Sequence, residues 1–324
     1  EAILDASEKW KNRCLLHNGS VFSDEKIWDI QYLAEMDRYF IQNPDEGNAD
    51  FITKLKGQLE EASPQTRQLA AELRWLMLLF PSQLKPSTKR AQVISIFSWS
   101  GQDLPDNHPM LSDSVLGGVG SSGTAYMTGP WRELRYLIRV TTAFKKLPSA
   151  KQDSIANDPW AWSEWLEGAS QGDNRQLYHM LSFLLFPDSF ERISSGGHKC
   201  SIIMAVNGMS KKDVWNMSWK DVDKALLLIR QQNQEKHKSS QLDFYYSPLK
   251  ELWSKEKPDN SGKTEQTPIN QHDNAKTSLS NDQSDAGPSP AYPMTQAYSE
   301  LFVRNEDIDK AICLLLAKKN IVLQ

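Results

Sequence analysis

Hydrophobic residues recur every three or four positions through much of the chain, a spacing typical of helices that bury one face. One such run begins after Ser63 and Pro64, a pair suited to cap and start a helix, and extends to Phe80. A second run begins at Pro130 and extends to Phe144. Strand-like alternation is scarce. We therefore expect a mainly α fold, a multi-helix globular body that contains a glycine-rich loop.

Two further helices are marked in the second half of the body. The pair Ser218 and Asp221 resembles a capping box, and an apolar run follows it. The preceding helix is indicated by an apolar stripe made of Leu177, Met180, Leu181, Leu184 and Leu185. Both patterns add to the expectation of a helical body.

The composition changes most clearly after the helical body. From residue 256 to 291 the chain contains four prolines, many Ser, Asn, Asp and Gln, and no aromatic residue. Such a segment buries too little apolar surface to offset the entropy lost on ordering. We expect a disordered, flexible linker at 256–293. It would follow an N-terminal helical segment at 1–65 and a helical body at 66–255, and precede a C-terminal piece at 294–324.

The C-terminal piece has the pattern of a helix followed by a short buried strand. Asn305 is suited to cap the helix, and Ile321–Gln324 has the character of the strand. A helix, a turn and a buried strand form the lead-in to a P-loop, whose glycine-lysine turn is not in this chain. Because the chain also begins at Glu1 without Met, we expect a fragment, with a motor domain that starts here and continues beyond it.

The charges are distributed unevenly, although the net charge is only −4. Residues 67–151 carry 11 basic and 5 acidic side chains, whereas residues 152–174 carry 5 acidic side chains and no basic one. This asymmetry either steers an anionic partner to the basic segment or pairs the two segments with each other.

Cysteine usage and hydropathy bear on the compartment. The three cysteines are far apart and odd in number, so they predict no disulfide framework and fit a reducing cytoplasm. No apolar run approaches the roughly 18–20 residues that a membrane span needs. We therefore expect a cytoplasmic protein without a membrane partner.

One glycine motif is easily mistaken for a cofactor site. Gly118–Gly123 fits the G-x-G-x-x-G pattern of dinucleotide-binding loops, which follows a strand and precedes an acidic residue about twenty positions on. Here a polar, proline-bearing stretch precedes the motif, and the residues about twenty positions on are basic. We instead expect a turn that lets Tyr126 and Trp131 pack against the body. No catalytic residue, cofactor-binding residue or metal ligand is predicted in this chain.

A row of basic residues on the helix from Pro130 is the best candidate for a binding surface. Its members fall within about 60° of one another on the helix surface, opposite the apolar face; they are Arg132, Arg135, Arg139 and Lys146. Such a row is suited to contact a phosphate backbone. The alternatives are an ordinary solvated face, or salt bridges to the acidic segment 152–174.

Four more residues are candidates for the same function. Arg192, His198 and Lys199 form a second basic group that is suited to extend the surface. Trp160 follows a helix-starting proline, and an exposed indole there is suited to stack on a flipped base or to anchor a partner. The alternative for a tryptophan at such a position is burial in the core.

Several of these runs together resemble the region that precedes the motor of bacterial McrB-type AAA+ proteins, the motor subunits of methylcytosine-dependent restriction and related anti-phage systems. Leu184–Lys199 and the last seven residues are the most specific parts of the resemblance. The matching runs are Phe51–Leu55, Gln68–Leu73, Leu79–Pro81, Gly118–Gly120, Gly123–Tyr126, Trp131–Leu134, Phe183–Ile193, Asp243–Tyr245 and Lys318–Gln324.

The resemblance implies that the intact protein is a ring-forming NTPase that binds GTP or ATP with Mg²⁺ just after Gln324 and activates a nuclease subunit. None of the family's phosphate-binding residues is present, so the resemblance implies no enzyme activity for this chain. Two functions remain open. One is an N-terminal sensor that binds DNA or another phage-derived trigger. The other is an assembly module that contacts neighbouring subunits or a nuclease effector without nucleic acid.

Overall fold

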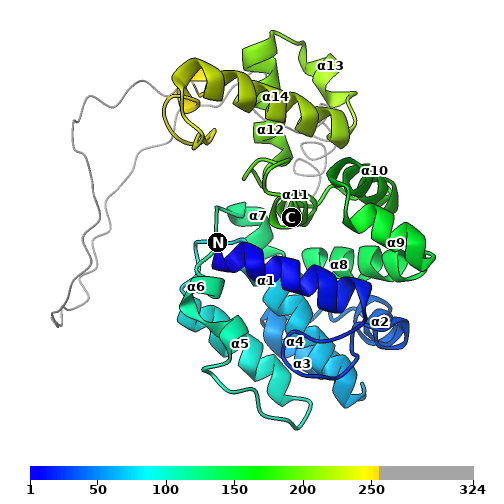
Figure 1. Ribbon diagram of the computed structural model, residues 1–324. Coiled ribbons are helices and arrows are strands. Elements are labelled where there is room, and N and C mark those ends of the chain that lie inside the picture. Colours follow the sequence, from blue (N-terminus) through cyan, green and yellow to red (C-terminus); the bar gives the residue numbers. More distant parts are fainter. Residues whose placement is uncertain (255–324) are drawn as a thin grey trace, which may run out of the picture. The chain divides into compact units, whose positions relative to one another are not determined.

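Helices make up most of residues 1–254, the part of the chain that the computed structural model describes (Figure 1). Within this range the structure contains no β-strand, only an isolated bridge between Pro81 and Gly120. The mainly α prediction is therefore confirmed for these residues. The linker predicted at 256–293 lies outside the described residues, as does the lead-in to a P-loop predicted at 294–324.

The described helices follow one another through short connections, and Figure 1 labels most of them. In chain order they are α1 (Ala2–Trp10), η1 (Lys11–Leu16), α2 (Ile30–Met36), η2 (Asp37–Ile41), α3 (Phe51–Gln58), α4 (Pro64–Leu79), α5 (Pro86–Ser98), η3 (Pro109–Leu111), α6 (Asp113–Leu116), α7 (Gly123–Thr128), α8 (Pro130–Lys145), α9 (Ser149–Ala156), α10 (Pro159–Ser170), α11 (Gln176–Leu185), α12 (Gly196–Asn207), α13 (Lys211–Trp215), α14 (Trp219–His237) and η4 (Lys250–Leu252). Residues 1–254 form one compact unit.

The predicted helix starts are confirmed. Ser63 caps α4, since its side chain accepts a hydrogen bond from the Thr66 N–H group at 3.3 Å. Pro130 is the first residue of α8, where its missing N–H group costs no hydrogen bond. Ser218 caps α14 by accepting from the Asp221 N–H group at 3.1 Å. Local sequence therefore determines where these three helices begin.

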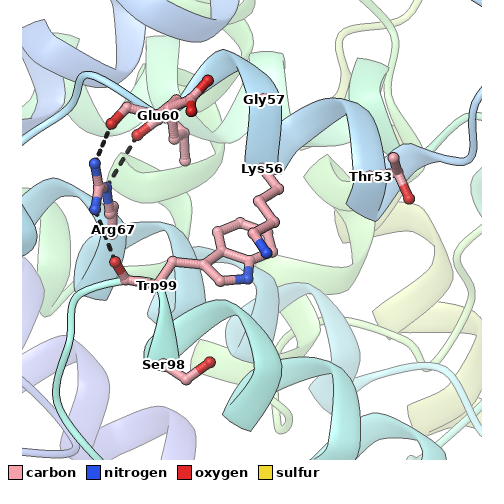
Figure 2. Close-up of a pocket in the computed structure, with 8 residues that line it drawn as sticks. Thr53, Lys56, Gly57, Glu60, Arg67, Ser98 and Trp99 are labelled. Atoms are coloured by element: carbon pink, nitrogen blue, oxygen red, sulfur yellow. Dashed lines mark hydrogen bonds between the residues drawn. The ribbon is translucent and has the colours of Figure 1, made fainter.

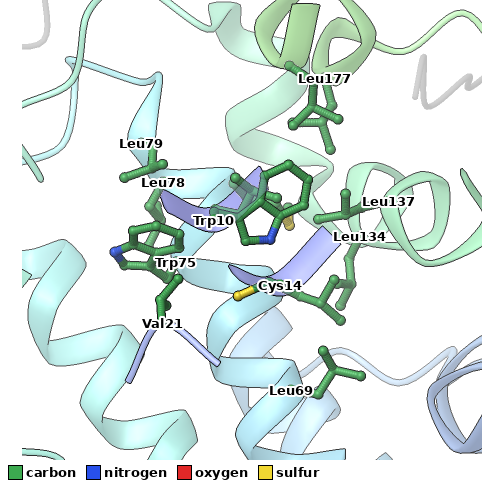
Figure 3. Packing of buried hydrophobic residues seen from close by; sticks show 14 of the residues in the cluster. Trp10, Cys14, Val21, Leu69, Trp75, Leu78, Leu79, Leu134, Leu137 and Leu177 are labelled. Carbon is green, nitrogen blue, oxygen red and sulfur yellow. The ribbon is translucent and has the colours of Figure 1, made fainter. Parts of the chain in front are cut away.

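Helix α4 lies at the centre of the larger hydrophobic core. Every residue from Gln68 to Leu79 is buried, because α2, α5, α6 and α8 all pack against this helix. Figure 3 shows Leu69 and Trp75 of α4 among the side chains of this core, together with Trp10 of α1. Since α4 is buried on nearly every side, its stability depends on the helices that surround it.

A buried carboxylate on α4 organises the connection between η1 and α2. Glu72 accepts hydrogen bonds from the Ser20 hydroxyl group, from the Val21 N–H group at 3.0 Å and from the Trp28 indole N–H group at 2.5 Å. Burial raises the pKa of Glu72, and these hydrogen bonds to the carboxylate oppose the rise. The residue thus holds a long polar connection against the core.

A smaller hydrophobic core is formed by the helices after residue 192. Helix α12 packs against both α13 and α14, and Figure 1 shows α12 and α14 side by side. The buried apolar residues of this core are Ile193, Cys200, Ile202, Ile203, Val214, Val222, Leu226, Ile229, Phe244 and Leu249. A fully buried ion pair joins α12 to α14 here, with 2.5 Å between Lys199 Nζ and Asp223 Oδ1.

The connection 117–122 joins α6 to α7 and lies directly on the end of α4. Gly118 has a φ of +80°, and a Cβ atom there would lie 2.2 Å from the Pro81 carbonyl oxygen, so only glycine fits. Beyond the connection, Tyr126 is buried and donates to the Met77 carbonyl oxygen at 2.8 Å, as expected. Trp131 was expected to pack similarly, but it is 42% exposed because it lies on the solvent side of α8.

Candidate functional site

The exposed face of α8 carries the row of basic residues that the sequence predicts. Arg139 and Lys146 are exposed, and Arg132 and Arg135 are half-buried. At about 1.5 Å per residue, the row from Arg132 to Lys146 extends over about 21 Å. That length corresponds to about six steps of a nucleic-acid strand at about 3.4 Å each. The opposite face of α8 packs against α2, α4, α10 and α11.

An exposed indole lies at the N-terminal end of this row. The guanidinium groups of Arg132 and Arg135 lie 5.1 Å and 5.3 Å from the ring centroid of Trp131, which is cation–π distance. The Arg135 Nε atom is buried and has no hydrogen-bond partner within residues 1–254. The result is a surface with one large aromatic ring, two stacked arginines and two cations further along, which we call the α8 cationic face (Trp131, Arg132, Arg135, Arg139 and Lys146).

The acidic segment 152–174 directs three of its five carboxylates to partners outside the α8 cationic face. Its Glu164 pairs with Lys220 at 2.6 Å, and its Asp173 pairs with Arg175 at 2.6 Å. Its Glu167 accepts two hydrogen bonds of 3.1 Å from the Trp219 N–H group, at the start of α14.

Within residues 1–254, no carboxylate forms an ion pair with Arg135, Arg139 or Lys146. One alternative to a phosphate-binding row was that these residues form salt bridges with the acidic segment 152–174. For Arg135, Arg139 and Lys146 no such salt bridge is found in residues 1–254. An ordinary solvated face remains as the alternative.

The buried side of α8 is held by charged residues of its own. Lys145 donates to the Cys14 carbonyl oxygen at 2.7 Å, to the Leu15 carbonyl oxygen at 2.6 Å and to the Asn18 side chain at 2.6 Å. Burial lowers the pKa of Lys145 to about 8. Glu133 accepts from the Leu177 N–H group at 3.1 Å, and burial raises the pKa of Glu133 to about 7. These contacts fix the helix and hence the direction of its exposed face.

The remaining candidates lie elsewhere. Lys199 is fully buried and paired with Asp223, so it is not a surface cation. The centroid of the Trp160 ring lies 5.4 Å from that of the Phe190 ring and 5.3 Å from the Lys224 ammonium group. This indole therefore already has two neighbours. Arg192 and His198 do come together, at a cavity beside the connection 117–122.

In that cavity the glycine motif offers little to a phosphate. The Gly120 N–H group donates to the Phe80 carbonyl oxygen at 3.1 Å. The Ser122 N–H group donates to the Gln83 side chain at 3.2 Å, and the Gly123 N–H group donates to the Ser121 hydroxyl group at 3.3 Å. A dinucleotide-binding loop needs such groups free, and it also follows a strand. Here the helix α6 precedes the motif.

A second hollow lies between α3, α4 and α5 and has a volume of about 570 Å³. Figure 2 shows Arg67 at its edge, with its guanidinium group directed at the carbonyl oxygens of Glu60 and Trp99. A third acceptor is the Leu59 carbonyl oxygen, at 3.0 Å from Nε. Arg67 therefore connects the ends of α3 and α5, and three of its N–H groups are used within the fold.

Comparison of the chain with models of known protein families, with curated proteins and with solved structures found no match. Among residues 1–254, no group of three or more His, Cys, Asp or Glu side chains is placed to hold a metal ion. None of the helices described in this range is both long and apolar enough to cross a membrane.

Sequence reasoning missed two features of the site. It placed Trp131 in the body, although the sequence carries a signal for exposure: Arg132 is the next residue and Arg135 follows Trp131 by four positions, so the indole lies beside the basic row. It placed Lys146 and not Lys145 in the basic row, which agrees with the exposure of Lys146, but it gave no role to Lys145, which is half-buried. The contacts of Lys145 could not be predicted, because its partners lie some 130 residues earlier in the chain.

Proposed function

We propose that this chain is the sensor region of a defence NTPase of the McrB type and that it binds DNA through the α8 cationic face. The observation that carries the proposal is the arrangement of Arg135, Arg139 and Lys146, which share one helix face without an acidic partner in residues 1–254, next to an exposed indole. Cations in such a row contact phosphates, and an exposed aromatic ring stacks on a base.

The rest of the proposal depends on the sequence resemblance. In the intact protein, a ring-forming AAA+ motor would bind GTP or ATP with Mg²⁺, and a nuclease subunit would act as effector. The helical region would pass the binding signal to the motor. Phosphate contacts alone carry no sequence information, so the α8 cationic face would supply affinity and orientation rather than recognition of a particular site.

Titration of the chain with duplex and single-stranded DNA at about 50 and 200 mM salt tests this proposal. Three phosphate contacts predict a fall in affinity of about 40-fold over that range, because each contact releases condensed counterions. Reversal of the two exposed cations, in the variant Arg139→Glu/Lys146→Glu, is expected to abolish most of the binding. The matched control is Lys211→Glu/Lys212→Glu, which makes the same charge change at exposed positions of α13.

Absence of binding at low salt, or equal loss in both double variants, would show that the α8 cationic face is only a solvated surface. Thermal unfolding of each variant verifies that the fold is intact, since exposed charge changes usually alter stability by less than about 0.5 kcal/mol.

A second candidate function is assembly without nucleic acid. Trp215 of α13 and Leu228 of α14 are 45% and 54% exposed, which provides large apolar side chains for a protein partner. Light scattering over a concentration series, for the wild-type chain and for a Trp215→Ala/Leu228→Ala variant, measures this. Concentration-dependent association that the double substitution removes favours the assembly function, and a monomer at every concentration counts against self-association through this surface.

A further inference from the structure

A cavity of about 510 Å³ lies between the connection 117–122, the start of α12 and the pair Tyr245 and Tyr246. Its volume falls in the usual range of small-molecule sites, roughly 300–1,000 Å³. It does not include the α8 cationic face. Its lining includes the side chains of Ser121, Gln176, Arg192, Ser195, His198 and Tyr246.

The hydroxyl groups of Ser121 and Ser195 each have an O–H donor available for a ligand. Ser121 Oγ accepts from the Gln83 side chain at 2.8 Å and from the Gly123 N–H group at 3.3 Å. Ser195 Oγ accepts from the His198 N–H group at 3.2 Å, as the cap of α12. A hydroxyl oxygen that accepts in this way still carries its own O–H donor, and no acceptor for either donor occurs within residues 1–254.

A guanidinium group forms one wall and is fixed in place. Arg192 donates from Nε and from Nη2 to the Asp243 carboxylate at 2.8 Å and 2.6 Å, and from Nη1 to the Val119 carbonyl oxygen. Five N–H donors are available on a guanidinium group, and the Tyr246 hydroxyl group also accepts from this side chain, so one donor remains for a ligand. Asp243 is not one of the lining residues, and no Asp or Glu side chain lines the cavity.

The imidazole of His198 is also held in one orientation. Its Nδ1 atom lies 3.0 Å from the Tyr245 hydroxyl group, and its ring packs 5.3 Å from the Trp253 ring. Burial lowers the pKa of His198, which favours the neutral form of the ring. With Nδ1 bonded to Tyr245, Nε2 is the ring atom left for a ligand.

Gln176 and Tyr246 indicate which other groups a ligand of this cavity would carry. Gln176 Oε1 is buried without a hydrogen-bond partner in the described part of the chain, so the cavity holds an unsatisfied acceptor that a ligand hydroxyl or amino group would satisfy. Tyr246 is 64% exposed, and the Arg192 guanidinium group lies 5.8 Å from its ring centroid. An exposed aromatic ring at the mouth offers a flat surface to a ring of the ligand.

We propose that this cavity binds a small organic phosphate of about nucleoside monophosphate size. The phosphate group would accept from Arg192, Ser121 and Ser195, a hydroxyl or amino group would donate to Gln176, and the ring would lie against Tyr246. Donors outnumber acceptors in the cavity and no carboxylate lines it, so an anion rich in acceptor atoms fits better than a cation. The proposal is independent of DNA binding by the α8 cationic face.

Calorimetric titration of the chain with AMP, ribose 5-phosphate, inorganic phosphate and adenosine tests the proposal. AMP is expected to bind most tightly, ribose 5-phosphate and inorganic phosphate progressively more weakly, and adenosine not measurably. The series also separates a nucleotide from a sugar phosphate as the source of the phosphate. Absence of binding by all four, or equal binding of adenosine and AMP, would overturn the proposal.

Two substitutions locate the binding. Gln176→Glu places a carboxylate in the cavity and is expected to weaken AMP binding at least about tenfold by charge repulsion. Gln231→Glu makes the same charge change on the exposed surface of α14 and should leave binding unchanged. Tyr246→Ala removes an exposed ring, so the fold should persist, and it should weaken AMP more than inorganic phosphate. Unchanged AMP affinity in Gln176→Glu and Tyr246→Ala would contradict this assignment of the cavity.

Discussion

The exposed face of α8 and the core between α12 and α14 place basic residues in opposite surroundings. On α8, Arg139 and Lys146 are exposed and have no acidic partner in the described part of the chain. Between α12 and α14, Lys199 is fully buried and paired with Asp223. Nearby, Arg230 pairs with Glu191 at 2.6 Å, and both side chains are largely covered.

The difference shows how to separate structural cations from those available to a partner. A cation removed from water is tolerated only with a compensating charge and hydrogen bonds, so its role is already set by the fold. An exposed cation without a partner contributes almost nothing to stability, so a row of them on one face is informative about binding. By this criterion Lys199 leaves the set of candidate DNA contacts, and Arg139 and Lys146 stay in it.

Breaking the buried pair should have the largest effect. Lys199→Met removes the ammonium group and leaves the Asp223 carboxylate without a counter-charge, which typically costs about 3–5 kcal/mol. Burial already raises the pKa of Asp223, and Lys199 opposes that rise. The free energy of unfolding, from urea denaturation, measures the loss. The variant Lys199→Met/Asp223→Leu should recover much of it, and a double variant as unstable as Lys199→Met would argue against a charge effect.

A pH effect on the buried side of α8 should be somewhat smaller. Burial raises the pKa of Glu133 to about 7, so the folded protein binds this proton more tightly than the unfolded chain. Stability from this group is present at pH 5 and is lost as pH rises through about 7. Relative to Glu133→Gln, the wild type should lose about 2–3 kcal/mol between pH 5 and 8. Chemical denaturation at both pH values measures this, and parallel pH dependence in the two proteins would exclude Glu133 as the cause.

The two lysines at the end of α8 allow a direct comparison of a half-buried, hydrogen-bonded cation with an exposed one. Lys145→Met removes a donor shared by two carbonyl oxygens and the Asn18 side chain, and this should cost about 1–3 kcal/mol. Lys146→Met should change stability by less than about 0.5 kcal/mol, since Lys146 is exposed. In DNA titrations the order should reverse, with the larger loss of affinity in Lys146→Met. Equal stability of the two variants would show that Lys145 does not stabilise the fold more than Lys146 does.

Much of the fold was predictable because helix starts and apolar stripes are local signals. Ser63, Pro130 and Ser218 begin their helices as predicted, and the stripe from Leu177 to Leu185 lies in α11. The long connection from Asn18 to Trp28 could not be predicted, because it is held by Glu72, a residue more than forty positions away.

The candidate site was predictable only in part. Helical spacing places Arg132, Arg135 and Arg139 on one face, and this follows from the sequence alone. The sequence did not predict that Arg192 and His198 line one cavity with Ser121. These two residues follow Ser121 by about seventy residues or more, and Tyr246, which also lines the cavity, is further away still. The binding roles of these residues remain proposals.

By itself, the sequence determined the helical class of the body, the first residues of several helices and the angular alignment of the α8 cations, because each depends on interactions within a few residues along the chain. Only the tertiary structure decided which charges are buried, which carboxylates pair with which cations, and which groups Lys145 binds. Burial and pairing depend on segments brought together from distant parts of the chain, and no local pattern encodes which segments these are.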